Sequence, residues 1–347
     1  MYVAPRPRLE DDPYFAIRLA LLCVISFVAV QWIKPVFPVL VVALPVGLLA
    51  AQRKRFDPKL AIGAAVFFIA VVWAMTLLVE LTRETPVLML ALAFAVFTIG
   101  FYIVRRTGSP IGMLVVIAAA LMSIMALKSP QLLFYFRDGF TQGALLGAVV
   151  IPVLYWMIPP ATNAQNIMAP QLADGHHGAA SLIRASVLML LSFWLYAVMP
   201  ASDMLLAFGA IYVLVFPTGK QAITEAKERS LATLYGTIAA LIVLTGVAWI
   251  GHFAVLLGLI ALVGLFFGSR MIDGYHPSMV YQYALSVAVA LVATALSTQS
   301  PAYAAVMRIL LTSTGAIAAA VLVAILDILF LSRKAEMPAA LPKRSNN

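Results

Sequence analysis

Charged residues are scarce in this chain of 347 residues: they make up 11% of it, whereas apolar residues make up 63%. A soluble domain carries roughly a quarter charged residues and about half apolar ones, so this composition excludes a soluble globular protein. Acidic residues are fewest, with 14 Asp and Glu against 23 Lys and Arg. A basic balance is also typical of nucleic-acid binding. Here, however, the positive charge lies in short segments between apolar runs, which indicates membrane orientation and no nucleic-acid partner.

Cysteine and enzyme motifs are nearly absent. The single Cys23 lies inside the first apolar run, so no intrachain disulfide can form and cysteine does not indicate a compartment. No small-residue cleavage site follows that run, so we expect a retained signal-anchor helix. The G-x-x-x-x-G-K-[ST], G-x-S-x-G and H-E-x-x-H motifs are missing. The sequence therefore predicts no ATPase or hydrolase site, and we do not expect an enzyme or a cofactor.

Apolar runs fill most of the chain, and their lengths are close to the roughly 20 residues with which a helix crosses a hydrocarbon core. The second and eighth barely reach this length, and the twelfth exceeds it. The expected spans are Tyr14–Ile33, Val36–Ala51, Leu60–Leu81, Pro86–Val104, Pro110–Leu127, Gly139–Ile158, Ala180–Met199, Met204–Phe216, Leu231–Ile250, Phe253–Gly268, Met279–Leu296 and Tyr303–Leu331. The sequence thus predicts an all-α polytopic membrane protein with about twelve transmembrane helices in two pseudo-symmetric six-helix halves.

The domain boundaries follow from these runs. We expect a cytoplasmic N-terminal segment at 1–13, a first membrane half at 14–158 and a cytoplasmic linker at 159–179. A second membrane half at 180–331 and a disordered cytoplasmic tail at 332–347 complete the chain. Two halves of six spans share one orientation, so an axis along the membrane normal relates them.

A recurring pattern supports the duplication. In the stretch Phe208–Gly236 an apolar helix ends, a polar loop carries Lys220, Lys227 and Arg229, and a second apolar helix begins. The same order occurs earlier around 39–63, and Gly63 then corresponds to Gly236 at a shift of 173 residues. Arginines recur at matching places as well, in the pairs Arg18/Arg184, Arg106/Arg270 and Arg137/Arg308.

The basic residues predict the orientation. If the N-terminus is cytoplasmic, sixteen Lys and Arg fall on the inside and four, namely Lys34, Arg83, Lys128 and Arg137, fall on the outside. This bias agrees with the positive-inside rule. We therefore expect a multi-pass protein of the bacterial inner membrane with both termini in the cytoplasm.

Three arginines inside the expected spans are the candidate anion-binding residues: Arg18, Arg184 and Arg308. A guanidinium binds a carboxylate through two parallel hydrogen bonds, and Arg137 near the sixth span offers the same chemistry. Each arginine lies near a span end, so snorkelling of the side chain to the headgroups is the alternative interpretation.

Few acidic residues lie at membrane depth. The candidates for proton coupling are Asp327, Glu80 and Asp203, because a coupled transporter needs a group that titrates as access alternates. A helix-end carboxylate that faces water is the alternative. His176 and His177 lack the further ligands of a metal site, so no metal is predicted.

Glycines and prolines inside spans indicate close helix packing and broken helices. Gly143 and Gly147 in the sixth span, and Gly264 and Gly268 in the tenth, form G-x-x-x-G patterns. Prolines interrupt the second span at Pro38 and Pro45 and the sixth span at Pro152. Broken helices free backbone groups that line a cavity in transporters, although kinks that serve packing alone are equally consistent.

Two runs resemble the fusaric-acid-resistance (FUSC) superfamily, which includes the aromatic carboxylic-acid exporters. They are FPTGKQAITEAKERSLATLYGTIAA at 216–240 and the start of the twelfth span at 307–316, with Arg308, Thr312 and Gly315. The likeness covers most of the chain at the level of six plus six spans. Larger members resemble two membrane halves separated by a cytoplasmic domain, whereas the link here is about twenty residues.

This resemblance implies an inner-membrane secondary exporter of organic, often aromatic carboxylic, anions that is driven by protons. The implied partners are the anion, the lipid bilayer, a periplasmic membrane-fusion adaptor with an outer-membrane channel, and further copies of the chain in a homo-oligomer. Two alternatives stay open: a passive anion channel, and a membrane scaffold without transport of its own.

Overall fold

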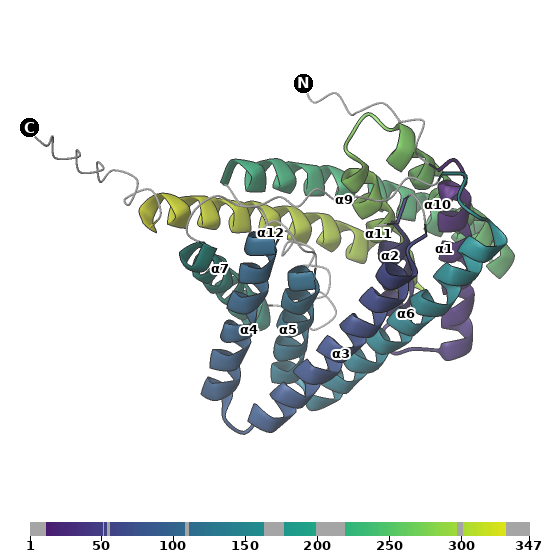
Figure 1. Cartoon of the computed structure of the whole chain (residues 1–347). Coiled ribbons are helices and arrows are strands. Elements are labelled where there is room, and N and C mark those ends of the chain that lie inside the picture. The colour runs from purple at the N-terminus through teal and green to yellow at the C-terminus, as the bar shows by residue number, and fades with distance from the viewer. Residues whose placement is uncertain are drawn as a thin grey trace, which may run out of the picture.

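Helices form the whole of the protein that the structure describes (Figure 1). The structure is a computed structural model, and it describes residues 12–50, 52–53, 56–107, 111–162, 177–198, 219–296 and 301–330. The helices in these ranges are α1 (Phe15–Ile33), α2 (Pro38–Ala50), α3 (Pro58–Thr82), α4 (Pro86–Thr107), α5 (Ile111–Lys128), α6 (Pro130–Met157), α7 (His177–Val198), α9 (Gly219–Ile250), α10 (Phe253–Asp273), α11 (Ser278–Ala295) and α12 (Pro301–Phe330). Each of these eleven helices overlaps one of the expected spans, and the eighth expected span, Met204–Phe216, lies outside the described residues.

Prolines mark where several helices begin. The helices α2, α3, α4, α6 and α12 each start at a proline. Proline lacks the amide hydrogen that the first helical turn leaves unbonded, and its fixed φ suits a helix start. Pro45 and Pro152 lie inside α2 and α6, as the sequence predicted.

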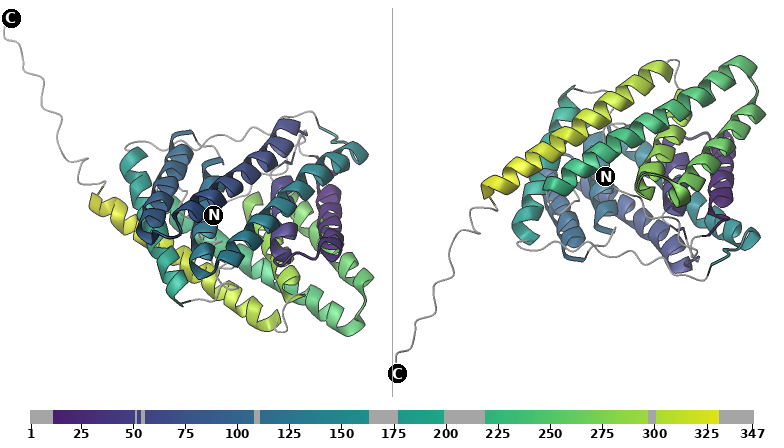
Figure 2. Two further views of the ribbon diagram at one scale, coloured as in Figure 1. Left: turned by 90° about the horizontal axis from the view of Figure 1, so that it is seen from below. Right: turned by 90° about the horizontal axis from the view of Figure 1, so that it is seen from above.

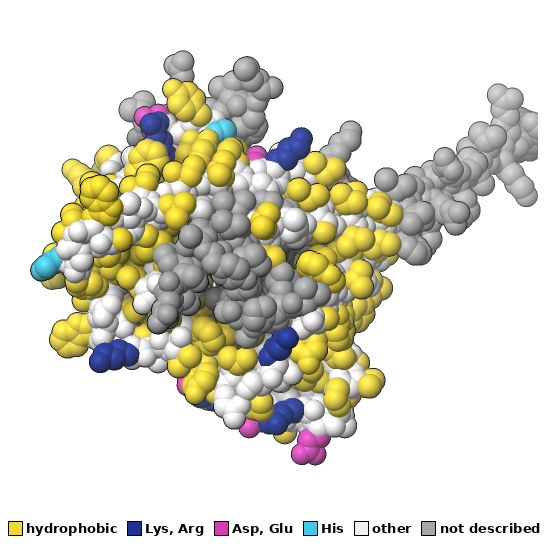
Figure 3. All heavy atoms as spheres, turned by 180° about the vertical axis from the view of Figure 1, so that it is seen from behind, with side chains coloured by type: hydrophobic (Ala, Val, Ile, Leu, Met, Phe, Trp, Pro, Cys, Tyr) yellow, Lys and Arg dark blue, Asp and Glu magenta, His cyan; other side chains and the backbone are white. Residues whose placement is uncertain are grey.

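Eight of the described helices are long and apolar enough to cross a membrane by length and composition: α1, α3, α4, α6, α7, α9, α10 and α11. Apolar side chains also cover the outside of the protein, and Figure 3 shows a hydrophobic face with the Lys, Arg, Asp and Glu gathered toward its upper and lower ends. Trp32, Trp156 and Trp249 lie near the ends of their helices and are at least 82% exposed. Tryptophan is enriched at that depth, where one end of the ring meets lipid and the other water.

Two expected boundaries were wrong. The segment around Lys220–Arg229 is not a polar loop, because α9 already begins at Gly219. This segment is rich in Ala, Glu, Lys and Gln, which favour a helix even where the composition is too polar for a hydrocarbon core. Helix α6 begins at Pro130 rather than Gly139, so Arg137 lies within a helix.

The described helices form two sets that make corresponding contacts. In the first, α3 packs on α5 and α6, and α5 packs on α4 and α6; in the second, α9 packs on α11 and α12, and α11 packs on α10 and α12. Helices α1 and α7, which precede the two sets in the chain, each pack on the other set: α1 packs on α10, and α7 packs on α4. Figures 1 and 2 show α3 beside α6 and α9 beside α12 as two long diagonal pairs.

The buried positions of α4 and α10 also correspond to each other. A constant shift of 167 residues relates six buried positions of α4 to the six buried positions of α10. The pairs are Met89/Leu256, Ala93/Ile260, Phe97/Gly264, Gly100/Phe267, Phe101/Gly268 and Val104/Met271. The expected pair Arg106/Arg270 differs from this register. The expected pair Gly63/Gly236, in α3 and α9, lies in two different environments. Gly63 is exposed with open space around it, whereas Gly236 packs on the carbonyl oxygen of Ala284.

The two glycine patterns do bring helices close together, as the sequence predicted. A Cβ on Gly264 would lie 2.7 Å from the Cα of Ala20 in α1, and one on Gly268 would lie 2.8 Å from the Cα of Ala16. A Cβ on Gly143 would lie 2.6 Å from the carbonyl oxygen of Leu40 in α2. Contacts of this kind require a residue without a side chain.

Candidate functional site

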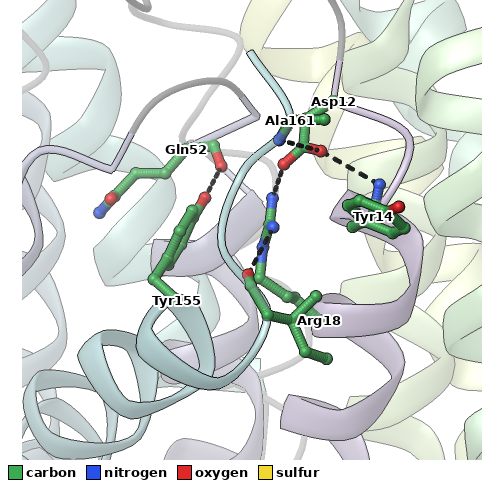
Figure 4. Close-up of polar contacts among 7 residues, drawn as sticks. Asp12, Tyr14, Arg18, Gln52, Tyr155 and Ala161 are labelled. Carbon is green, nitrogen blue, oxygen red and sulfur yellow. Dashed lines mark hydrogen bonds and ion pairs between the residues drawn. The ribbon is translucent and has the colours of Figure 1, made fainter. Parts of the chain in front are cut away.

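Arg18 lies in the first turn of α1, and its side chain is completely buried. Nη2 forms an ion pair with Asp12, and Nη1 donates a 3.0 Å hydrogen bond to the carbonyl oxygen of Ile158. The guanidinium carbon lies 4.2 Å from the centre of the Tyr155 ring. Figure 4 shows the side chain held between α1 and the C-terminal end of α6.

The residues around Arg18 connect four segments of the chain. The Asp12 carboxylate accepts hydrogen bonds from the backbone amides of Tyr14 (3.1 Å) and Ala161 (3.2 Å). The Tyr155 hydroxyl donates a 2.5 Å hydrogen bond to the carbonyl oxygen of Gln52. The N-terminal segment, the chain after α2, α6 and the start of the linker therefore meet at one guanidinium–carboxylate pair (Figure 4).

This geometry shows what a buried arginine of this protein binds. Arg18 does not extend to a surface; it holds a carboxylate, which the chain itself supplies. A guanidinium that is also stacked on an aromatic ring presents a planar fork, and an aromatic carboxylate would match both features.

Arg184 occupies the corresponding place in α7. A shift of 166 residues relates Arg18, Leu22 and Ser26 to Arg184, Leu188 and Ser192, and all six positions are buried. The Arg184 side chain donates a 3.0 Å hydrogen bond from Nη1 to the carbonyl oxygen of Ala180 and has a further interaction. In this alignment of α1 with α7, the two arginines fall at the same position.

Arg137 lies in a different environment. It is 22% exposed, forms an ion pair of 2.8 Å with Asp138, and its guanidinium carbon lies 4.5 Å from the Trp73 ring centre. The Trp73 indole in turn donates a 3.2 Å hydrogen bond to the Thr141 hydroxyl. This cluster lies on the outside of α3 and α6, so Arg137 is not part of the buried arginine sites.

In the described part of the structure, the remaining candidate residues do not form a common site. Glu80 is exposed near the end of α3. Arg308 and Asp327 lie in α12, but their side chains are outside the described part of the structure, and Asp203 is outside it entirely. Within the described ranges, no group of three or more His, Cys, Asp and Glu is placed to hold a metal ion.

One buried charge cluster was missed by the sequence interpretation. Arg229 donates a 2.9 Å hydrogen bond from Nε to Glu225, and its guanidinium carbon lies 3.1 Å from the Tyr283 ring centre. Both charged side chains are less than a tenth exposed. The spacing of four residues between Glu225 and Arg229 was the available signal, because such pairs face each other on a helix. It was overlooked because this segment was expected to be a loop.

The arrangement of apolar helices with buried charge pairs defines an all-α polytopic membrane protein. Residues 187–322 match the model of the fusaric acid resistance protein-like family. Residues 187–322, from α7 into α12, are therefore similar to a fusaric acid resistance protein-like domain, which is a shorter part of the chain than the resemblance led us to expect. No curated protein and no solved structure matches the chain.

Proposed function

We propose that this protein is an inner-membrane secondary exporter of organic anions, most of all aromatic carboxylates. The observation that supports this most is the pair of wholly buried arginines, Arg18 and Arg184, at equivalent positions of α1 and α7. Buried arginines are costly in a membrane protein and mark substrate pathways. The fusaric acid resistance protein-like domain supports the same class of function.

The proposal includes a two-half architecture of about twelve helices, with halves at 14–158 and 180–331 and a linker at 159–179. The equivalent packing of α3–α6 and α9–α12, and the shift of 167 residues between α4 and α10, support it. An axis along the membrane normal then relates Arg18 to Arg184. A site between the halves would have one arginine from each half.

Transport needs a driving force and an orientation. We assign proton coupling to one of the acidic residues Asp327, Glu80 and Asp203, and auxiliary anion contacts to Arg308 and Arg137. Both termini face the cytoplasm in this proposal because of the bias of basic residues to one side. Export from the cytoplasm would release the anion into the periplasm, and a membrane-fusion adaptor with an outer-membrane channel would transport it across the outer membrane.

The test is export from cells or proteoliposomes that contain the full chain. We expect efflux of labelled benzoate against its gradient, abolished by a protonophore, and reduced at least about tenfold in an Arg184→Ala variant that is present at equal level in the membrane. A current that follows voltage alone would identify a passive anion channel instead. An absence of flux for a panel of organic anions, with a stable partner complex, would identify a scaffold.

A further inference from the structure

We propose that the carboxylate of Asp12 occupies an anion-binding site on Arg18, and that a transported carboxylate binds there by displacing it. Asp12 is then a tethered competitor, which weakens the apparent affinity of the protein for its substrate. This inference rests on the proposed function and deepens it, since it says how one of the two arginine sites is regulated.

The Asp12 carboxylate lies among the donors that an anion needs. Nη2 of Arg18 forms an ion pair with it, and the backbone amide of Ala161 donates a 3.2 Å hydrogen bond to it. Both side chains of the ion pair are completely buried. Arg18 lies on α1 and Ala161 follows α6, so both donors can also bind a carboxylate that is not part of the chain (Figure 4).

Asp12 uses only part of the guanidinium. Its Oδ2 pairs with Nη2 of Arg18, while its Oδ1 accepts hydrogen bonds from the amides of Tyr14 and Ala161. Nε of Arg18 is buried, and no group among the described residues accepts a hydrogen bond from it. Nε and Nη2 form one edge of the guanidinium, which can hold a carboxylate through two parallel hydrogen bonds. A free carboxylate can therefore satisfy a buried donor that the tethered one leaves unpaired.

The surroundings of the guanidinium favour an aromatic acid that comes from outside the protein. The guanidinium carbon lies 4.2 Å from the centre of the Tyr155 ring, which stacks on the Phe56 ring at 4.8 Å between centres. Tyr14 and Ala161, whose amides bind the Asp12 carboxylate, are both exposed. The site is therefore close to the surface of the protein, and a movement of the turn that carries Asp12 would open it.

A tethered competitor has a predictable effect on binding. A group on a short link has an effective concentration at its site on the order of millimolar, and a site that is open for only a fraction of the time has an apparent Kd raised by the reciprocal of that fraction. Removing the Asp12 carboxylate should therefore tighten the binding of a free carboxylate. It should also lower the KM for its export, because the same site takes up the transported anion.

The experiment compares the wild-type chain with the variants Asp12→Ala and Asp12→Ser. The rise of the thermal midpoint with benzoate, measured on the full chain in detergent, gives the Kd, and export from proteoliposomes gives the KM. We expect both constants to fall at least about tenfold in both variants. Asp12→Ser keeps a side-chain oxygen that can accept from the Tyr14 amide, so it preserves the turn if the alanine variant does not accumulate.

Two controls test whether the carboxylate and the guanidinium are the groups that bind. Benzamide, which has the aromatic ring without the charge, should not raise the midpoint of any variant. The double variant Arg18→Gln/Asp12→Ala removes both charges of the buried pair and should show no rise with benzoate. An equal rise with benzamide, or a rise that persists in the double variant, would overturn the proposal. So would an unchanged Kd in the two Asp12 variants.

The KM separates this inference from the proposed function. Export of benzoate by the wild-type protein with an unchanged KM in the Asp12 variants would leave the exporter standing, and would show that any tighter binding occurs in a cavity left by Asp12. That result would overturn the inference. Tighter binding in the Asp12 variants and its loss in the double variant, without export by any of the proteins, would leave the carboxylate site on Arg18 standing and remove the proposed function.

Discussion

At the scale of single residues, the protein balances two of its buried arginines with a carboxylate from a neighbouring part of the chain. Arg18 uses Asp12 and the Ile158 carbonyl, and Arg229 uses Glu225 and the Tyr283 ring. Without such partners, desolvation of a guanidinium would cost several kcal/mol, on the order of the whole stability of a domain. The buried charges therefore fix how the surrounding segments meet.

The first prediction concerns Tyr155 at this junction. Tyr155→Phe keeps the ring under the Arg18 guanidinium but removes the hydroxyl that donates to Gln52. We expect a loss of about 1–3 kcal/mol, because the Gln52 carbonyl loses its buried donor, and little change in export. Thermal unfolding in detergent measures the loss. Tyr155→Leu, which removes the ring as well, should be clearly less stable, and equal stability of the two variants would contradict a role for the ring.

At the scale of helices, the α1–α10 contact depends on glycine. Gly264→Ala should destabilise the protein by about 1–3 kcal/mol, because the added Cβ would lie 2.7 Å from the Cα of Ala20 and must push the helices apart. Gly258→Ala in the same helix is the matched control, since no atom lies within 4 Å of its Cβ. The control should be neutral or more stable by up to about 1 kcal/mol, because alanine favours a helix. Equal effects of the two substitutions would exclude close packing as the cause.

How far the sequence predicted this fold depends on the kind of contact. The described helices were predictable because each overlaps one apolar run, and the G-x-x-x-G pattern of α10 correctly indicated close approach. The start of α9 was not predicted, because Lys220 and Lys227 were taken as loop residues although their neighbours favour a helix. Nor was the partner of Arg18 predicted, because Asp12 lies six residues before it in the segment that precedes α1, and this is not a spacing at which helical residues face each other.

At the scale of the whole molecule, the first helix of each set packs on the other set. Helix α1 lies against α10, and α7 lies against α4. If the two sets moved apart, the faces of α10 and α4 that α1 and α7 cover would therefore become exposed. A relative motion of the halves must carry α1 and α7, and with them Arg18 and Arg184, past the opposite half. In the proposed exporter, alternating access would use such a motion.

The last prediction is the orientation of the molecule in the membrane. We expect both termini and the segments 52–59 and 219–229 on the cytoplasmic side, because basic residues concentrate there and the positive-inside rule holds for short loops. Single cysteines introduced into a Cys23→Ala background can be labelled from either side of intact cells, because Cys23 is the chain's sole cysteine. A cysteine at exposed Lys227 should be protected from an impermeant maleimide, whereas one at exposed Lys128, the last residue of α5, should react. Labelling in the opposite sense at both positions would invert the orientation and make the proposed export an uptake. Labelling of both from outside would mean that an even number of spans separates the two positions, and the two-half arrangement would fail.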